Sequence, residues 1–296
     1  MVFSTICFDD LRIFNSGYLK EMYYLSVYAI FKNEAEIFKE WVEHYLSQGV
    51  DHFYLIDNGS TDNYKEVLEP FMDHITLIHD DEKGGQLNIY NRHILPKLEE
   101  TEWVIGIDLD EFVYTKDGTI ASTLRNLKDP SIGQIMIPWK QFGSSGYIMQ
   151  PSSVVESFLY RIKLPWTAPF KMICRSRALK QIGVHSSYIK DEFITVGPFL
   201  NRIEGNPGDM ELTEELLEKS LFRLNHYAIQ SLDWFRRVKM TRGDVANNVS
   251  NVKNEETFKL ADYKDVFDDD LAVRQKNRDH SMVLSVLVIL LLLILI

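Results

Sequence analysis

Cysteine is scarce in this chain, whose 296 residues include two, Cys7 and Cys174. Two cysteines build neither a disulfide framework nor a cysteine-based zinc site. One disulfide between them would be possible, but nothing in the sequence requires it. We therefore interpret them as two unrelated thiols of a protein in a reducing compartment.

The glycine-rich loops that bind phosphate groups in two large enzyme classes are also missing. No Gly-x-Gly-x-x-Gly follows the first predicted strand, and no Gly-Lys-Ser or Gly-Lys-Thr occurs. These absences argue against a dinucleotide-dependent enzyme and against a P-loop kinase.

Basic side chains are outnumbered by acidic ones, 32 to 43, which gives a formal net charge of −11. This balance argues against nucleic acid as a partner, because phosphate backbones attract surfaces rich in lysine and arginine. It does not exclude a single nucleotide held through a metal ion. Hydrophobic residues make up 45% and charged residues 25% of the chain, as in a globular protein with a full core. The length fits one large domain or two small ones.

A secretory signal is not evident at the N-terminus, because residues 1–23 contain charged side chains and no apolar core segment. We expect these residues to form a loose arm. The other end is different, since residues 282–296 are apolar apart from Ser285. This run is slightly shorter than the roughly 20 residues that span a bilayer. Basic residues precede it, as on a cytoplasmic flank: Arg274, Lys276 and Arg278.

We predict that this tail, 281–296, is a single transmembrane helix that leaves the preceding residues on the cytoplasmic side. The alternatives are a buried C-terminal strand and an apolar tail without function. The segment before it, 256–280, is acidic and then basic, and we expect a linker there.

The first third of the chain alternates between strand-like and helix-like segments. Such alternation is typical of a parallel sheet with crossover helices. The predicted strands are Tyr24–Phe31, His52–Ile56, His74–Ile78 and Trp103–Ile107, and the predicted helices run from about residue 38 to 46, from 61 or 62 to 68, and from 87 to 95. Beyond residue 112 the alternation weakens. There we expect helices at Thr119–Leu127, Glu211–Lys219 and Ser231–Thr241, and strands at Gln134–Trp139 and Leu221–Asn225.

Acidic side chains follow the strand Trp103–Ile107, in the sequence Asp108-Leu109-Asp110-Glu111. Asp108 and Asp110 are two residues apart, so on an extended strand end they would face the same way. Two neighbouring carboxylates repel each other unless a cation or a proton lies between them. A hard divalent ion, with substrate phosphates as its other ligands, fits this arrangement. The alternative is a loop with three solvated acids.

Two further polar clusters follow the first and second predicted strands: Lys32-Asn33-Glu34 and the run from Asp57 to Asp62. Carboxyl ends of parallel strands open on one edge of the sheet, where ligands of α/β proteins bind. Asp57 could accept a hydrogen bond from a nucleotide base, and Ser60 or Thr61 could bond ribose or phosphate. Each cluster alone could be a capped turn, but three at one edge indicate a binding site.

The motifs in their order and spacing resemble glycosyltransferase family 92 and its family 2-like relatives, over roughly Tyr24 to Val249. The resemblance rests on these motifs: Phe31-Lys32-Asn33-Glu34, Glu40-Trp41, Gly49-Val50, Asp57-Asn58-Gly59-Ser60-Thr61-Asp62-Asn63, Asp108-Leu109-Asp110-Glu111-Phe112, Trp139-x-x-Phe142-Gly143-Ser144-Ser145-Gly146 and Asn225-His226-Tyr227. It implies an α/β protein of the GT-A type, with a Rossmann-type mixed, largely parallel sheet flanked by helices. It also implies a nucleotide-diphosphate sugar donor, a divalent cation (Mn²⁺ or Mg²⁺) and a glycan or glycoconjugate acceptor.

By resemblance, Asp57 falls where such enzymes hold the nucleotide base, and Asp108 with Asp110 is their metal motif. From the resemblance and the strand-end clusters together we predict the following domain limits and site residues. A glycosyltransferase domain would span 24–255, with a nucleotide-binding half, 24–112, and an acceptor half, 113–255. Donor-binding residues would be Lys32, Asn33, Glu34, Asp57, Ser60, Asp62, Gln86 and Asp108. Asp108 and Asp110 would hold the metal, and a late histidine, His226 or His185, would complete the site. We favour His226 because it follows a predicted strand.

Other roles remain open in the sequence. Lys171, Arg175 and the basic residues Arg236, Arg237 and Lys239 could meet the diphosphate leaving group or be surface charge. Asp110 is a predicted catalytic residue through the metal. An inverting transfer needs a carboxylate base near the acceptor hydroxyl, for which Glu156, Asp191 and Glu192 are candidates.

The sequence thus predicts an inverting, metal-dependent glycosyltransferase with a UDP-linked donor. A catalytically silent protein that binds glycans or nucleotide sugars on the same scaffold is the alternative, because a fold does not guarantee an activity. A metal phosphohydrolase that uses the same acids is a third possibility.

Overall fold

The structure, a computed structural model, describes residues 22–204, 210–242 and 252–278. The predicted membrane tail, 281–296, and residues 1–21 of the predicted arm lie outside these ranges. Within them, no helix has both the length and the apolar character that a membrane span requires.

The described residues build one nine-stranded sheet in the order β3-β2-β1-β4-β9-β6-β14-β5, with β12 paired to β6. Its strands are β1 (Tyr23–Phe31), β2 (His52–Asp57), β3 (Ile75–His79), β4 (Thr101–Gly106), β5 (Glu111–Thr115), β6 (Ile132–Gln141), β9 (Phe170–Arg175), β12 (Ile194–Val196) and β14 (Phe222–His226). The first four strands are mutually parallel, whereas β9 is antiparallel to both β4 and β6. The prediction of an α/β fold with a mixed, largely parallel sheet is confirmed.

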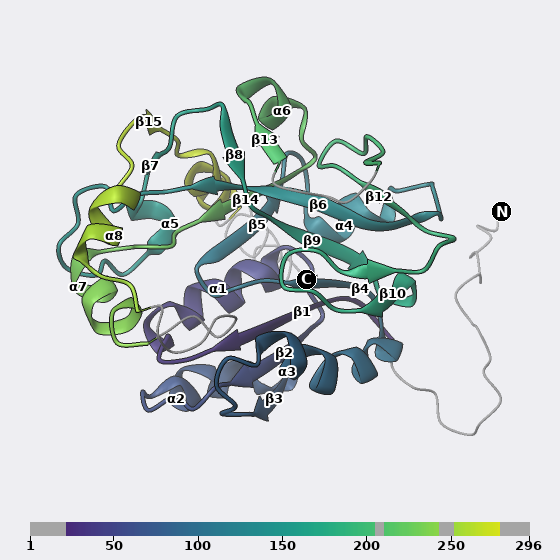
Figure 1. The fold of residues 1–296 in the computed structure, drawn as a ribbon, viewed down its shortest axis with the longest axis horizontal. Helices are drawn as coiled ribbons and strands as arrows, with labels where there is room; N and C mark the ends of the chain where they lie inside the picture. Colours follow the sequence, from purple (N-terminus) through teal and green to yellow (C-terminus); the bar gives the residue numbers. More distant parts are fainter. Residues whose placement is uncertain (1–21, 205–209, 243–251, 279–296) are drawn as a thin grey trace, which may run out of the picture.

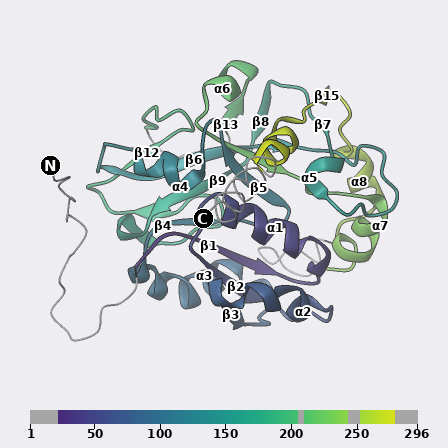
Figure 2. The same cartoon turned by 180° about the vertical axis from the view of Figure 1, so that it is seen from behind.

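Helices flank the sheet, as Figures 1 and 2 show from opposite sides. They are α1 (Ala35–Ser47), α2 (Tyr64–Leu68), α3 (Gln86–His93), α4 (Ile120–Arg125), α5 (Val154–Ser157), α6 (Glu214–Lys219), α7 (Leu232–Trp234) and α8 (Glu255–Ala261). Short strand pairs complete the fold: β7 (Tyr160–Arg161) with β15 (Val266–Phe267), β8 (Trp166–Ala168) with β13 (Met210–Leu212), and β10 (Leu179–Gln181) with β11 (Tyr188–Ile189).

Strand β1 supplies side chains to two hydrophobic cores because successive residues of a strand face opposite sides. Leu25 and Val27 pack in the core that contains the apolar face of α1. Tyr28 and Ile30 face the other way and pack in the core that contains Ile89 and Tyr90 of α3. The first half of the sheet is therefore buried on both faces, which explains the continuous apolar runs in its sequence.

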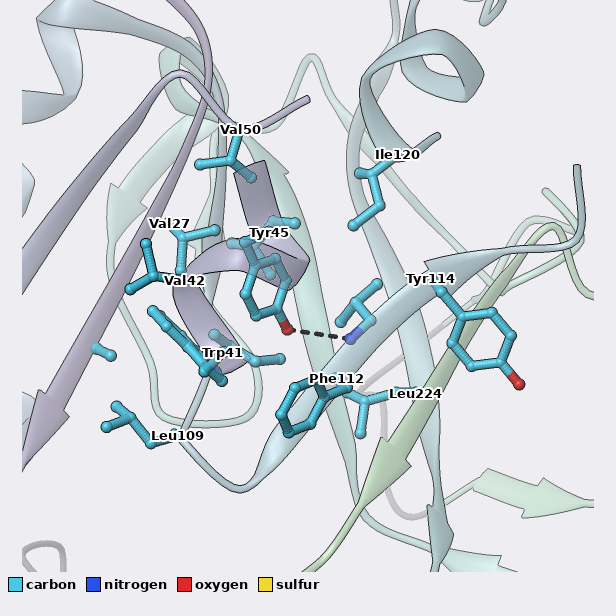
Figure 3. Close-up of a cluster of buried hydrophobic side chains, with 14 of the residues drawn as sticks. Val27, Trp41, Val42, Tyr45, Val50, Leu109, Phe112, Tyr114, Ile120 and Leu224 are labelled. Atoms are coloured by element: carbon cyan, nitrogen blue, oxygen red, sulfur yellow. Dashed lines mark hydrogen bonds between the residues drawn. The ribbon is translucent and has the colours of Figure 1, made fainter. Parts of the chain in front are cut away.

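Helix α1 is also hydrogen-bonded to β5 (Figure 3). The hydroxyl of Tyr45 accepts from the backbone N–H of Val113 at 3.0 Å and donates to the carbonyl of Glu111 at 3.0 Å. The ring of Tyr45 is fully buried. This bridge fixes the start of β5 relative to the nucleotide-binding half predicted from the sequence.

Several predicted helix boundaries differ from the structure for identifiable reasons. Helix α2 begins after Asn63 rather than after Asp62, because the Asp62 carboxylate accepts the backbone N–H of Ala35 at 2.8 Å. The helix predicted from Glu211 begins at Glu214, because Met210–Leu212 pairs with β8. Residues Ser231–Thr241 form α7 followed by a π-helical turn, Phe235–Lys239.

The segment predicted as a linker, 256–280, is packed on the domain as far as residue 278. It contains most of α8, strand β15 and a helical stretch from 270 to 278. Two of its acidic side chains, Asp268 and Asp270, are bound by basic residues of the domain instead of facing solvent as in a linker. Asp268 lies 3.0 Å from Lys140 and 2.7 Å from Arg161, and Asp270 lies 2.6 Å from Arg223.

Candidate active site

The first two polar clusters form one hydrogen-bonded unit at the carboxyl ends of β1 and β2. The backbone N–H of Asn33 donates to Ser60 Oγ at 3.1 Å, and that of Thr61 donates to Asn33 Oδ1 at 2.7 Å. Asn33 adopts a left-handed φ of 55°, a conformation that asparagine tolerates better than most residues. The loops therefore hold each other in place, and the predicted meeting of these clusters at one edge is confirmed.

Asp57 is the best-connected carboxylate of this unit. It accepts from the Ser60 N–H at 2.7 Å and from the Tyr64 hydroxyl at 3.0 Å, and it lies 3.0 Å from Nδ1 of His79. Burial opposes ionisation, but these hydrogen bonds outweigh it and lower the pKa of Asp57. A cleft of about 660 Å³ opens beside Asp57, and His79 and Leu77 also line it. The side chain of His79 is 65% exposed, whereas that of Asp57 is 6% exposed, so His79 lies between Asp57 and solvent.

Asp108 and Asp110 occupy the loop after β4, next to the first two clusters. Each is paired with a lysine from the second half of the chain. Asp108 Oδ2 lies 2.8 Å from Lys171 Nζ, and Asp110 Oδ2 lies 2.7 Å from Lys239 Nζ. Burial opposes their ionisation. The lysines nevertheless lower the pKa of Asp108 and, together with His226, hold that of Asp110 well below its usual range. Both acids are therefore ionised at neutral pH.

His226 ends β14, whose antiparallel pairing places it opposite Glu111 of β5. Its Nε2 lies 3.5 Å from Asp110 Oδ1, and its Nδ1 lies 2.9 Å from Oε1 of Gln141. When Nδ1 donates to this amide oxygen, Nε2 is left with a lone pair, which is the tautomer that a metal ligand needs. Burial lowers the pKa of His226 although Asp110 opposes this, which favours the neutral, metal-binding form.

His185, the other predicted histidine, also packs against Trp139. The Trp139 ring is 4.1 Å from that of His226 and 5.5 Å from that of His185, measured between centroids. Nδ1 of His185 lies 3.0 Å from the carbonyl of Phe170. The structure thus brings His226 to Asp110 and places His185 beside Trp139 and Phe170.

The donor atoms at Asp110 fit a divalent cation. In the described ranges, no group of three or more histidine, cysteine or acidic side chains is arranged to hold a metal ion by itself. Mg²⁺ and similar ions, however, need one or two carboxylates when substrate phosphates supply further ligands. Asp110 Oδ1 and His226 Nε2 lie 3.5 Å apart, and both can bind a metal ion when Nδ1 of His226 carries the ring proton. Ligands at about 2.1 Å from one ion lie roughly 3 Å apart, so a small adjustment would suffice.

Glu111 is fully buried beneath these acids. Its Oε2 accepts the backbone N–H of Asp108 at 2.9 Å and lies 3.5 Å from Lys171 Nζ, whereas Oε1 has no hydrogen-bond partner among the described residues. Burial raises the pKa of Glu111 well above its usual range, although Lys171 opposes this. Glu111 therefore holds the backbone of the loop at Asp108 and contacts Lys171.

A comparison with models of protein families identifies the family of this chain. Residues 22–257 match the model of glycosyltransferase family 92. The chain belongs to this family. The resemblance inferred from the motifs is thereby confirmed.

Curated relatives of this family 92 chain are distant in sequence. A family 92 protein of Oryza sativa subsp. japonica is 25% identical over 259 residues, which cover 84% of this chain and 40% of the relative. The glycosyltransferase GlyG of Streptococcus pneumoniae serotype 4 is 31% identical over 94 residues, 30% of this chain and 31% of GlyG. The chain thus spans about two fifths of the length of the family 92 relative. Among solved structures, residues 1–349 of TarS from S. aureus in complex with UDP match with a TM-score of 0.38 at 16% identity, over 60% of this chain and 61% of that solved chain.

The remaining predicted site residues of the family 92 chain lie in other surroundings. Asp191, whose side chain is 96% exposed, pairs with Lys180, and the half-exposed Glu156 lies 3.7 Å from Lys276. Gln86 is buried and donates to the hydroxyl of Tyr90. Arg175 lies opposite Trp103 in the β4–β9 pair and binds Glu102, away from the carboxyl end of β4. None of the described contacts of these residues joins them to Asp108 or Asp110.

The basic residues that complete the site were identified only in part from the sequence. Lys171 and Lys239 were among the open candidates, whereas Arg242 was not considered. Its guanidinium binds Glu34 at 2.8 Å and the carbonyl of Lys32. Burial opposes this charge, but Glu34 raises the pKa of Arg242. No local pattern indicates this role, because the partners are 208 and 210 residues away.

Proposed function

We propose that this family 92 chain is a metal-dependent glycosyltransferase that transfers a sugar, with inversion, from a UDP-linked donor to a hydroxyl group of a glycan or glycoconjugate. The observation that supports this most is the position of Asp57 with its cleft, and of Asp110 with His226, at one edge of the sheet. Asp57 with its cleft would form the binding site of the nucleotide base, and Asp110 with His226 would form that of the diphosphate.

The chain's own residues would act on different parts of the donor. Asp57 would accept the N3–H of uracil after His79 turns away, and the loop of Asn33 and Ser60 would position the ribose. Asp110, His226 and Asp108 would hold Mn²⁺ or Mg²⁺, which when bound supplies positive charge to the departing diphosphate. A carboxylate base would take the proton of the acceptor hydroxyl. Glu156 and Asp191 remain our candidates, and their exposure would let them meet an acceptor from solvent.

A donor screen tests this function. The protein is incubated with Mn²⁺ and a panel of nucleotide sugars, with and without glycan acceptors, and the products are identified by mass spectrometry. Transfer to an acceptor with release of the nucleoside diphosphate would support the proposal. Binding without any product would identify a silent binding protein, and donor breakdown that ignores the acceptor would identify a phosphohydrolase.

Replacing Asp57 with asparagine should change which base is bound. The variant loses an acceptor for uracil N3–H and gains an amide donor that suits the N3 acceptor of cytosine. We expect UDP to bind about tenfold more weakly, as for the loss of one hydrogen bond to a charged group, and the ratio of UDP to CDP affinity to fall. Calorimetry with both nucleotides measures this. Asp73→Asn, on the exposed turn before β3, is the matched control, and an unchanged UDP to CDP ratio would contradict the role of Asp57.

We also propose that the apolar tail, 281–296, inserts into a membrane and that the domain lies on its cytoplasmic side. The flank of the tail is fixed to the domain, since Arg278 donates to Ser47 at the end of α1 and Arg274 binds Asp270. We expect full-length protein to sediment with membranes and to resist extraction by carbonate, whereas a chain ending at residue 280 should stay in the supernatant. Release of the full-length protein by high salt or carbonate would rule out an integral anchor.

A further inference from the structure

The two lysines that bind the acids of the candidate metal site are not equivalent. Lys171 Nζ lies between two carboxylates, 2.8 Å from Asp108 and 3.5 Å from Glu111. Within the described ranges, Lys239 forms an ion pair with Asp110, at 2.7 Å, and with no second carboxylate. Loss of Asp108 to another cation would leave Lys171 beside Glu111. Loss of Asp110 would leave Lys239 without an ion pair among the described residues, because Glu34, whose charge also acts on Lys239, binds Arg242.

A π-helical turn directs Lys239 to Asp110. The N–H of Met240 donates to the carbonyl of Phe235, five residues earlier, at 2.9 Å. An α-helix turns by about 100° per residue, so the additional residue in this turn changes which side chain faces inward. Its neighbours Arg236 and Arg237 point outward to Glu255, Glu36 and Asp233. Such π turns are rare in proteins as a whole, but those that occur are often found at functional sites.

A divalent ion at Asp110 would compete with Lys239 for the same carboxylate. Asp110 and His226 would hold the ion, and Lys239 Nζ already binds Asp110 through Oδ2. Two cations on one buried carboxylate repel each other strongly, because buried charges are poorly screened. The ammonium group stands on a flexible four-carbon stem, so it can move a few ångströms to a new anion. The diphosphate of the donor would bring such an anion to the metal.

We propose that Lys239 is an exchangeable counter-ion. It neutralises Asp110 while the site holds no metal, and it transfers to the diphosphate when metal and donor bind. This inference rests on the proposed function. It makes Lys239 a residue with opposite effects on two ligands, since it opposes the binding of metal alone and supports the binding of the metal-bound nucleotide. A lysine with a purely structural role would not have this pair of effects.

The test compares Lys239→Met with the unchanged protein in two titrations. Mn²⁺ alone is titrated and its free concentration is followed by electron paramagnetic resonance, and UDP is then titrated by calorimetry at saturating Mn²⁺. In the variant we expect Mn²⁺ to bind about tenfold more tightly and UDP about tenfold more weakly, the size of one hydrogen bond to a charged group. Lys219→Met, which removes a lysine paired with Glu215 on the exposed helix α6, is the control and should change neither affinity.

A second variant covers the case in which Lys239→Met does not fold. Lys239→Gln can still donate to Asp110 but carries no charge, and the same opposite changes are expected. Unchanged Mn²⁺ affinity, or weaker binding of both ligands, would overturn the inference and leave the proposed function intact. If the unchanged protein bound neither Mn²⁺ nor UDP, the proposed function would fail and the inference with it.

Discussion

Replacing Asp110 with asparagine is expected to lower kcat/KM for sugar transfer by about 10²–10³-fold, the range for loss of one charge-stabilising group in an active site. Asparagine preserves the shape of the side chain but removes the negative charge that faces His226 and Lys239. A metal ion at this position would lose its charged ligand, and the leaving diphosphate would lose the metal. Initial rates with the donor identified by the screen, at several Mn²⁺ concentrations, measure the effect.

Two controls make the Asp110 result specific. Asp129→Asn changes an exposed acid that binds Ser131 in the turn before β6, and it should leave the rate unchanged. Thermal unfolding of Asp110→Asn distinguishes loss of chemistry from loss of fold, because the variant leaves the ammonium of Lys239 in a largely buried position. If a folded Asp110→Asn protein transferred sugar at an undiminished rate, the assignment of Asp110 as a metal ligand would be wrong.

Replacing Asp268 with alanine is expected to destabilise the protein by about 3–5 kcal/mol, as for the loss of one partner from a buried ion pair. Asp268 lies 3.0 Å from Lys140 and 2.7 Å from Arg161, whose side chains are 1% and 5% exposed. In the variant, Arg161 would still pair with Glu214. Lys140 would still bond the hydroxyl of Tyr114, but among the described residues it would have no acidic group within 4.0 Å. Urea unfolding measures the free energy.

The control for Asp268 is Glu256→Ala, an exposed acid on α8 in the same segment. A double variant, Lys140→Met with Asp268→Leu, should recover most of the loss, because it removes both charges at once.

The stabilisation by Asp268 should also depend on pH. Burial opposes ionisation of Asp268, but Lys140 and Arg161 lower its folded pKa below the unfolded value. Its stabilisation is therefore present above the unfolded pKa and is lost as the pH falls through the folded one. A stability of Asp268→Ala equal to that of the unchanged protein would mean that Lys140 finds another partner.

The parallel half of the fold could be predicted because its signals are local. The apolar runs that became β1, β2 and β4 are each followed by polar residues, and parallel pairing necessarily brings these ends to one edge. Asp57, Asp108 and Asp110 were found in this way. The structure places the three polar clusters at the carboxyl ends of β1, β2 and β4, as the alternation of strands and helices predicted.

The basic half of the site could not be predicted in the same way. Lys171 reaches Asp108 because β9 runs antiparallel between β4 and β6, so its first residues lie at the carboxyl end of β4. Nothing near Lys171 in the sequence indicates that pairing. Lys239 belongs to a segment predicted as a regular helix with a basic face, and the π turn separates it from Arg236 and Arg237. The acidic residues 262–270 suggested a linker because their partners, such as Lys140 and Arg161, are distant in sequence.

The position of β9 has a consequence for any attempt to divide this protein. The strand comes from the second half of the chain, yet it is the neighbour of β4, which lies in the half predicted to bind the nucleotide. A fragment ending near residue 112 would leave the backbone of β4 unpaired along an apolar edge, a template for aggregation. It would also lack Lys171, so Asp108 would lose the ammonium that lies beside it. The two halves therefore form one inseparable unit, and a split form of the protein would have to supply both pieces together.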